Sequence, residues 1–378
     1  MIYFDNSATT KPFEEVMTAY QKAATQFFAN PSSLHYLGSD AERLLMRTRQ
    51  AVAEQLRIET EEVIFTSGGT ESNNLAIKGI AFQHQTRGKH LITSSVEHPS
   101  VLEVFKELEQ NGFEVSYASV DHSGKVDPEE IKSLIRKDTI LISIMSVNNE
   151  LGTIQPLEEI GDIAGMYPKV LFHADHVQGI GKVPLSLKKA KVDLCSISGH
   201  KIHGLKGTGI LYVRKGVLLS PLFHGGGHEA NRRSGTENLP GMVAFAKALR
   251  MIKEKEKKQL NELIHLRHHL INQLNVMEQV IVNSPLSGAP HIINVSVPGI
   301  KPEVMIHALA KKNIFVSAKS ACSSKQPDVS SVLKACNLKE SVTKSAIRIS
   351  LSYSNTIEEA DLFLKEFNSA IRYLEKGR

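Results

Sequence analysis

One lysine lies where an amine could react with a carbonyl compound. Lys201 is part of a turn, 198–204, that is rich in glycine and histidine and follows an apolar run, 192–197. In open α/β sheets, ligands bind at the carboxyl ends of strands. An amine there can form a Schiff base with an aldehyde, and its surroundings can lower its pKa until it acts as a nucleophile or base. Because a solvated loop lysine has the same local features, other residues must decide between the two interpretations.

A stretch of small polar residues, 66–74, follows another predicted strand and opens a helix. Gly69 and Thr70 lie at its centre, where small residues let the backbone approach a ligand closely. The free N–H groups and the positive dipole end of a helix N-terminus bind anions, most naturally phosphate. The stretch is neither a Walker A motif nor a G-x-G-x-x-G turn. An ordinary helix cap by Ser67 or Thr70 is the alternative.

Two more strand ends carry side chains that suit a planar ring with a nitrogen atom. Asp175 ends a predicted strand, with Gln178 three residues further on, and a carboxylate there could keep a pyridine nitrogen protonated. His98 follows another strand and could stack on a planar cofactor and carry protons near neutral pH. The alternatives are an N-cap aspartate and a structural histidine.

Together these features point to one ligand at one sheet edge. They are a phosphate cradle, a stacking ring, an acid for a pyridine nitrogen and a Schiff-base amine, in the chain order Gly69-Thr70, His98, Asp175 and Lys201. A chance convergence of all of them is far rarer than any one alone. The set therefore predicts pyridoxal 5′-phosphate as the cofactor.

The C-terminal part of the chain adds a thiol and a guanidinium. Cys322 lies in a loop of small and polar residues, 315–325, where we expect an exposed thiol, and lysines nearby favour its thiolate. Cys195 and Cys336 are expected to be packing cysteines. Arg348 lies on an apolar strand, where a guanidinium needs an anion: either a substrate carboxylate or the partner in a structural ion pair.

The framework that must position these residues is predicted to be α/β. Short apolar runs predict strands at 62–66, 90–93, 113–117, 139–143, 170–174, 193–197 and 209–213. Helical patterns lie between most of them, at 40–56, 71–84, 99–110, 128–136 and 157–166. This alternation predicts a mostly parallel, doubly wound sheet. Because only a glycine-rich loop separates the last two strands, one of that pair is expected to be antiparallel.

A charged helix from about 239 to 274 is expected to link this sheet to a smaller α/β domain with strands at 292–296 and 346–350. The chain has 378 residues, a net charge of +5 and only 3 cysteines. It has no signal peptide, no membrane-spanning run, no nucleic-acid-binding pattern and no cysteine pattern for disulfides or zinc. We therefore expect a cytoplasmic protein with no metal, no membrane contact and no direct contact with nucleic acid.

As an ordered set, the motifs resemble the cysteine desulfurases, pyridoxal-phosphate enzymes of fold type I that supply sulfur for iron–sulfur clusters. The resemblance covers essentially the whole chain, with markers at 3–10, 30–35, 66–74, 147–152, 198–201, 233–238 and 320–324. The Ser-Ala-Cys-Ser-Ser motif at 320–324 is typical of the first, NifS/IscS-like group. The resemblance implies a large domain, 10–255, with a mostly parallel seven-stranded sheet flanked by helices. It also implies a small domain, 1–9 and 256–378, with a mobile cysteine loop at about 317–330.

The resemblance also implies how the cofactor would be held. Lys201 would carry it as a Schiff base, His98 would stack on its ring, Asp175 would pair with its nitrogen and Gln178 with its phenolic oxygen. The phosphate ligands would be Thr70, Ser198 and His200. Thr236 would reach the phosphate in a partner subunit, which implies a homodimer with shared sites.

For the substrate, L-cysteine, the resemblance implies a carboxylate held by Asn149 and Arg348. Cys322 would take the sulfur as a persulfide and leave L-alanine, then pass the sulfur to an acceptor protein for iron–sulfur cluster, thio-tRNA or thio-cofactor synthesis. Two residues depart from the family pattern: His176, where alanine is usual, and Lys319, where glycine is common. The first would place a titratable ring near the cofactor.

Three other functions remain open at this point. A selenocysteine lyase differs only in substrate, and an aminotransferase could share Lys201 and Asp175 without needing Cys322. A partner-binding scaffold of the same fold would need no catalysis, although the intact set of polar site residues speaks against it.

Overall fold

The computed structural model describes residues 1–318 and 330–376. Its larger sheet has seven strands in the order β2-β8-β7-β6-β5-β3-β4. They are β2 (Val63–Thr66), β3 (His90–Ser94), β4 (Glu114–Ala118), β5 (Thr139–Met145), β6 (Leu171–Asp175), β7 (Leu194–Ser198) and β8 (Gly209–Val213). Every pairing is parallel except those of β8, which is antiparallel to both β2 and β7. The predicted α/β class and the expected antiparallel strand are confirmed.

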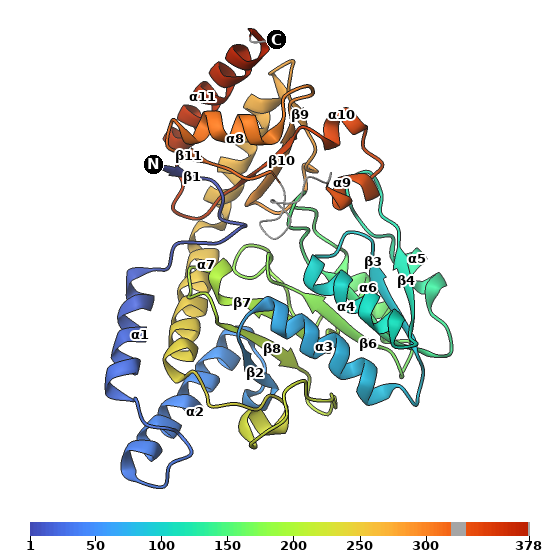
Figure 1. Cartoon of the computed structure of the whole chain (residues 1–378), viewed down its shortest axis with the longest axis vertical. Helices are drawn as coiled ribbons and strands as arrows, with labels where there is room; N and C mark the ends of the chain where they lie inside the picture. Colours follow the sequence, from blue (N-terminus) through green and yellow to red (C-terminus); the bar gives the residue numbers. More distant parts are fainter. Residues whose placement is uncertain (319–329, 377–378) are drawn as a thin grey trace.

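Helices cover the sheet (Figure 1), and buried apolar side chains form a layer on each of its faces. The central strand β5 is buried along its whole length, and such a strand reads as a continuous apolar run because neither of its faces meets water. On one face Leu75 and Phe105 pack from α3 (Gly69–His84) and α4 (Pro99–Gln110). The other face is covered by α2 (Tyr36–Leu56), α6 (Leu157–Ala164) and α7 (Leu239–Asn275). Other elements of this part are α1 (Glu14–Gln26), the turn η1 (Thr60–Glu62), α5 (Pro128–Leu134), η2 (Gly199–Lys201) and η3 (His228–Asn231).

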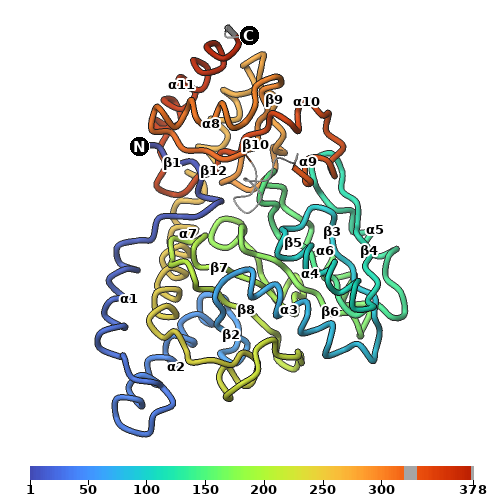
Figure 2. The backbone as a smooth tube through the Cα atoms, viewed as in Figure 1, coloured from blue at the N-terminus to red at the C-terminus, as the bar shows by residue number. Residues whose placement is uncertain are grey.

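The long helix α7 leads to a second, antiparallel sheet in the order β12-β10-β9. Its strands are β9 (Ile281–Val282), β10 (Ile292–Ser296) and β12 (Ala346–Ser350), and the helices near them are α8 (Pro302–Ala310), α9 (Ser331–Ala335), α10 (Glu340–Thr343) and α11 (Ile357–Lys376). The N-terminal strand β1 (Ile2–Tyr3) pairs with β11 (Ile314–Phe315). Both chain termini therefore lie in this part of the molecule (Figure 2).

A separate apolar core joins the N-terminus, the second half of α7 and the C-terminal elements. This core supports the division into a large domain, 10–255, and a small domain, 1–9 with 256–378. The domain division stays a prediction.

The predicted strands agree with the structure to within a residue or two at their ends, whereas α1, α8 and α11 were not predicted. No helix in the described part of the chain is long and apolar enough to span a bilayer.

A buried ion pair ties α2 to the loop that precedes α7. Arg49 donates from Nη1 and Nη2 to the two carboxylate oxygens of Glu229, at 2.8 and 2.5 Å. The same carboxylate accepts the backbone N–H of Phe65 in β2 at 2.9 Å. Only 2% of the Glu229 side chain is exposed, so water cannot replace these partners if the charge is removed.

Glu229→Gln is expected to lower the free energy of unfolding by about 3 kcal/mol, because it leaves Arg49 as a buried, uncompensated charge. Chemical denaturation of the purified proteins measures this loss. The matched control is Glu61→Gln, which removes a solvent-exposed pair with Lys215 and should change the free energy of unfolding far less. Equal effects of the two changes would contradict the prediction.

Candidate active site

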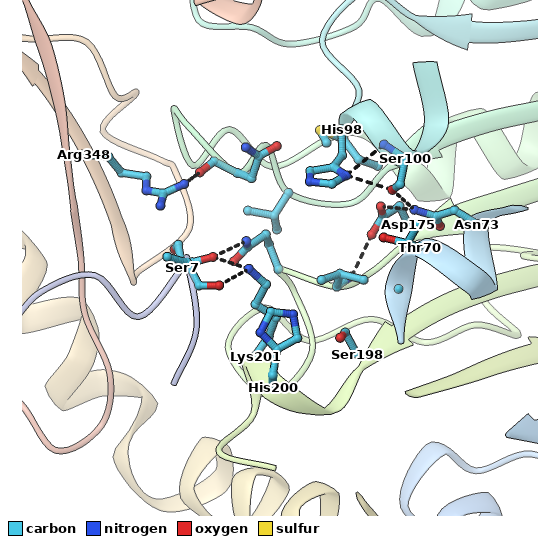
Figure 3. Close-up of a pocket in the computed structure, with 17 residues that line it drawn as sticks. Ser7, Thr70, Asn73, His98, Ser100, Asp175, Ser198, His200, Lys201 and Arg348 are labelled. Carbon is cyan, nitrogen blue, oxygen red and sulfur yellow. Dashed lines mark hydrogen bonds between the residues drawn. The ribbon is translucent and has the colours of Figure 1, made fainter. Parts of the chain in front are cut away.

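A pocket forms where loops at the carboxyl ends of strands in the large sheet meet Arg348 of β12 (Figure 3). The structure brings ten of the predicted site residues to its wall: Gly69, Thr70, His98, Asn149, Asp175, Gln178, Ser198, His200, Lys201 and Arg348. They come from segments far apart in the sequence, and they meet because parallel strands end at the same edge of a sheet. Their individual roles stay predictions.

Lys201 is held by a turn in which three successive carbonyl groups, those of residues 199–201, accept hydrogen bonds. The carbonyl of Gly199 accepts the N–H groups of Ile202 and Gly204, and that of His200 accepts the N–H of Thr10 at 2.9 Å. The carbonyl of Lys201 itself accepts Nζ of Lys182 at 2.8 Å. With the backbone fixed in this way, the Lys201 amine enters the pocket and donates to the carbonyls of Ser7 and Ala8.

The amine behind this turn is itself buried. Only 2% of Lys182 is exposed, and desolvation lowers its pKa to about 8, against an opposing effect of the Glu256 carboxylate on α7. Lys182 thus connects the Lys201 turn to α7.

Asp175 lies at the end of β6 with both carboxylate oxygens oriented. Oδ1 accepts the N–H of Val177 at 3.0 Å, and Oδ2 accepts Nδ2 of Asn73 at 2.8 Å. Each carboxylate oxygen has two lone pairs, so both keep capacity for a protonated ring nitrogen. The carboxylate is buried, which strengthens its interaction with any nearby positive charge.

The phosphate end of the predicted site is built from small residues. Gly68 has φ +145°, which favours glycine, and a Cβ on Gly69 would lie 2.8 Å from the side chain of Val177. No side chain among the described residues caps the N-terminus of α3, so its first N–H groups can serve an anion. His200 is uncharged near neutral pH, because burial and the nearby Lys201 lower its pKa to about 4.

Several buried polar atoms around the pocket have no partner among the described residues: Ser7 Oγ, Asn73 Oδ1, Asn149 Oδ1, Gln178 Oε1, Ser198 Oγ and Arg348 Nε. An unpaired buried polar group is costly, so such a cluster indicates a ligand site. An anion cradle, a carboxylate and an amine complete the set. These groups fit a ligand that carries a phosphate, a basic ring nitrogen and an aldehyde, as pyridoxal 5′-phosphate does.

Two partners were predicted for Arg348, a structural ion pair and a substrate carboxylate, and the structure shows the ion pair. Its Nη1 donates to the carbonyl of Asn149 at 2.8 Å, and Nη2 donates to Ser317 Oγ at 2.8 Å and to Asp5 Oδ1 at 3.2 Å. The structural ion pair with Asp5 is therefore present. The Nε of Arg348 has no partner within 1–318 and 330–376 and can donate to a second anion, so the contact with a substrate carboxylate stays a prediction.

One predicted site residue does not line the pocket, and another lies outside the described residues. Thr236 lies exposed between η3 and α7 and does not line the pocket. Cys322 and Lys319 lie outside the described residues. The described residues on either side of that segment bind close to the pocket: Ser317 contacts Arg348, and Ser330 donates to Glu150 at 2.6 Å.

The sequence interpretation missed two polar residues and misplaced a third. Asn73 and Ser100 line the pocket and link Asp175 to His98 by hydrogen bonds. Both belong to sequence motifs from which only other residues had been assigned to the site. His176 does not line this pocket; its ring packs on Gly179 and its Nδ1 bonds to Ser146 Oγ at 2.8 Å. Cys195 and Cys336 are buried free thiols, and no group of side chains within 1–318 and 330–376 could hold a metal ion.

Comparisons with known proteins agree with one another over nearly the full length. A sequence model of the aminotransferase class-V family matches residues 2–363. A NifS/IcsS protein homolog of Lactobacillus delbrueckii subsp. bulgaricus is 45% identical over 100% of this chain and 98% of its own. The cysteine desulfurase IscS of Methanosarcina thermophila is 44% identical over 96% of this chain and 90% of its own.

Solved structures give the same result. A NifS-like protein superposes with a TM-score of 0.93 at 38% identity, covering 98% of this chain and 99% of the other. A structure described as SspA in complex with cysteine has a TM-score of 0.83 at 34% identity, covering 94% of this chain and 100% of the other. The chain therefore belongs to the aminotransferase class-V family and, within it, to the NifS/IscS-like cysteine desulfurases.

Proposed function

We propose that this protein converts L-cysteine to L-alanine and transfers the sulfur to Cys322 as a persulfide. As a member of its family it is an enzyme that uses pyridoxal 5′-phosphate. The observation that carries the proposal is that an amine, a carboxylate and an anion cradle meet in one pocket, around polar atoms that have no partner among the described residues. The related structure with bound cysteine supports the choice of substrate.

The bound cofactor supplies an electron sink for the charge that develops at the substrate α-carbon. Asp175 would hold the ring nitrogen in its protonated form. The Lys201 amine lies in the pocket and would take the α-proton and return it. Asn149 and Arg348 would orient the substrate carboxylate.

The sulfur transfer balances without an added oxidant. The Cys322 thiolate attacks the substrate sulfur, so that a sulfur–sulfur bond forms while the carbon–sulfur bond breaks with its electrons moving to carbon. The carbon then takes up the proton that the thiol has lost. The products are alanine and a persulfide, which a separate acceptor protein would consume.

A homodimer is part of the proposal. Thr236 is exposed and away from the pocket of its own chain, as a residue that serves a partner's phosphate would be. Large apolar side chains are exposed near the start of α2: Phe28, Leu34 and Tyr36. A second copy of the chain is the simplest cover for them.

A cytoplasmic location is consistent with the free thiols of Cys195 and Cys336.

Lys201→Ala is expected to abolish the borohydride-reducible absorption of the lysine-bound cofactor and to slow alanine formation at least about 100-fold, because the same amine binds and moves protons. Absorption spectra and an alanine assay measure the two effects. The control is Lys206→Ala, since Lys206 lies in the next loop and does not line the pocket. Normal turnover by the Lys201 variant without cofactor would refute the proposal.

Cys322→Ala should still bind L-cysteine, which shifts the cofactor spectrum, but should not turn over. Mass spectrometry of the parent after one turnover should find one extra sulfur on the peptide that contains Cys322. Cys336→Ala is the control, because that thiol is fully buried and should not take part. Sulfide and alanine release by the Cys322 variant at the parent rate would identify a different acceptor.

A further inference from the structure

We propose that Ser100 and Asn73 are positioning residues that fix His98 as the neutral tautomer with its proton on Nε2. His98 then serves a ligand as a hydrogen-bond donor and a stacking ring and does not carry protons. The tautomer is a property of this chain alone, whereas its catalytic consequence rests on the proposed function.

The backbone determines which ring nitrogen accepts. His98 is the N-cap of α4, and its Nδ1 accepts the backbone N–H of Ser100 at 3.1 Å. An amide N–H can only donate, so Nδ1 must present its lone pair. In a neutral imidazole the proton is then on Nε2. Both described partners of the ring bind Nδ1, which leaves the Nε2–H group for a ligand in the pocket (Figure 3).

A side-chain relay enforces the same assignment from the other side. The Asp175 carboxylate can only accept, so Asn73 must turn its NH₂ group toward it, at 2.8 Å. The same NH₂ group donates to Ser100 Oγ at 2.9 Å. The Ser100 hydroxyl proton is thereby directed to Nδ1 of His98, 2.8 Å away. Each hydrogen bond from Asp175 to His98 therefore has a fixed donor and acceptor, and the last of them requires an unprotonated Nδ1.

Position and charge disfavour the imidazolium form. The N-terminus of α4 is the positive end of a helix dipole, where a cation is unfavourable and an imidazole stays neutral. Burial lowers the pKa of His98, and the nearby Lys201 and Arg348 lower it further. Asp175 on β6 acts in the opposite direction. His200 is neutral, and Glu97, with a pKa raised to about 8 by burial, adds no full charge at neutral pH.

Proton movement at the substrate therefore falls to Lys201. A neutral imidazole that gave up its Nε2 proton would become an imidazolate, which is inaccessible near neutral pH. Taking up a proton at Nδ1 would oppose the Ser100 N–H and break the relay. The Nε2–H donor can instead hold an acceptor atom of a bound ligand without changing its own charge.

The test is nitrogen NMR of the cofactor-loaded enzyme, labelled with ¹⁵N-histidine, in which His98 is assigned by its loss in His98→Gln. We expect an unprotonated Nδ1 and a protonated Nε2, with no titration between about pH 6 and 9. A protonated Nδ1, or a titration within this range, would overturn the proposal. This readout does not depend on turnover, so an inactive enzyme with the expected tautomer would count against the proposed function alone.

Ser100→Ala removes the hydroxyl link but keeps the backbone N–H. Because a donor to the neutral ring is lost, the pKa of His98 should rise toward its ordinary value, and kcat should fall about 10-fold, as expected for one lost hydrogen bond. Ser100→Thr keeps the hydroxyl and should restore both. Ser133→Ala, on exposed α5, is the matched control and should leave the His98 signals unchanged. Unchanged His98 signals in Ser100→Ala would show that the relay does not act on the ring.

Discussion

The site depends on a rigid backbone beneath Lys201. Carbonyl groups in that turn are held by Thr10 from the N-terminal segment, by N–H groups of the turn itself and by the buried ammonium of Lys182. A reactive lysine is long and has many rotamers, so its amine can be placed only if its main chain does not move. The fold provides this with a buried amine whose desolvation is partly offset by Glu256 on α7.

The sequence predicts this site well where a residue's position follows from a strand end. Asp175 and Lys201 could be assigned because each follows an apolar run and parallel strands end at a common edge. Asn73 and Ser100 could not, since their role arises only when the N-termini of α3 and α4 come together. His176 was misplaced for a geometric reason: side chains of consecutive extended residues point to opposite faces, so the neighbour of Asp175 faces away from the pocket.

The secondary-structure elements also divide into those that the sequence predicts and those that it does not. The strands of the large sheet were predictable because they are buried on both faces and carry apolar runs. The helices α1, α8 and α11 were not predicted. They pack on α7, on β11 and on one another, and these contacts between distant segments form only in the folded chain. The Glu229 ion pair was also beyond prediction, since Glu229 adopts a left-handed backbone conformation in a loop that meets α2 only in the folded chain.

The bond from Phe65 to Glu229 has a consequence for solubility. The strand β2 lies at the outer end of the sheet, and its sequence, Val-Ile-Phe-Thr, combines strong β-propensity with no charge. An open edge of that kind is a template on which another chain can add a strand and start an aggregate. By occupying the N–H of Phe65, the Glu229 carboxylate blocks that addition, and its ion pair with Arg49, which also donates to the carbonyl of Val63, lies against the same strand.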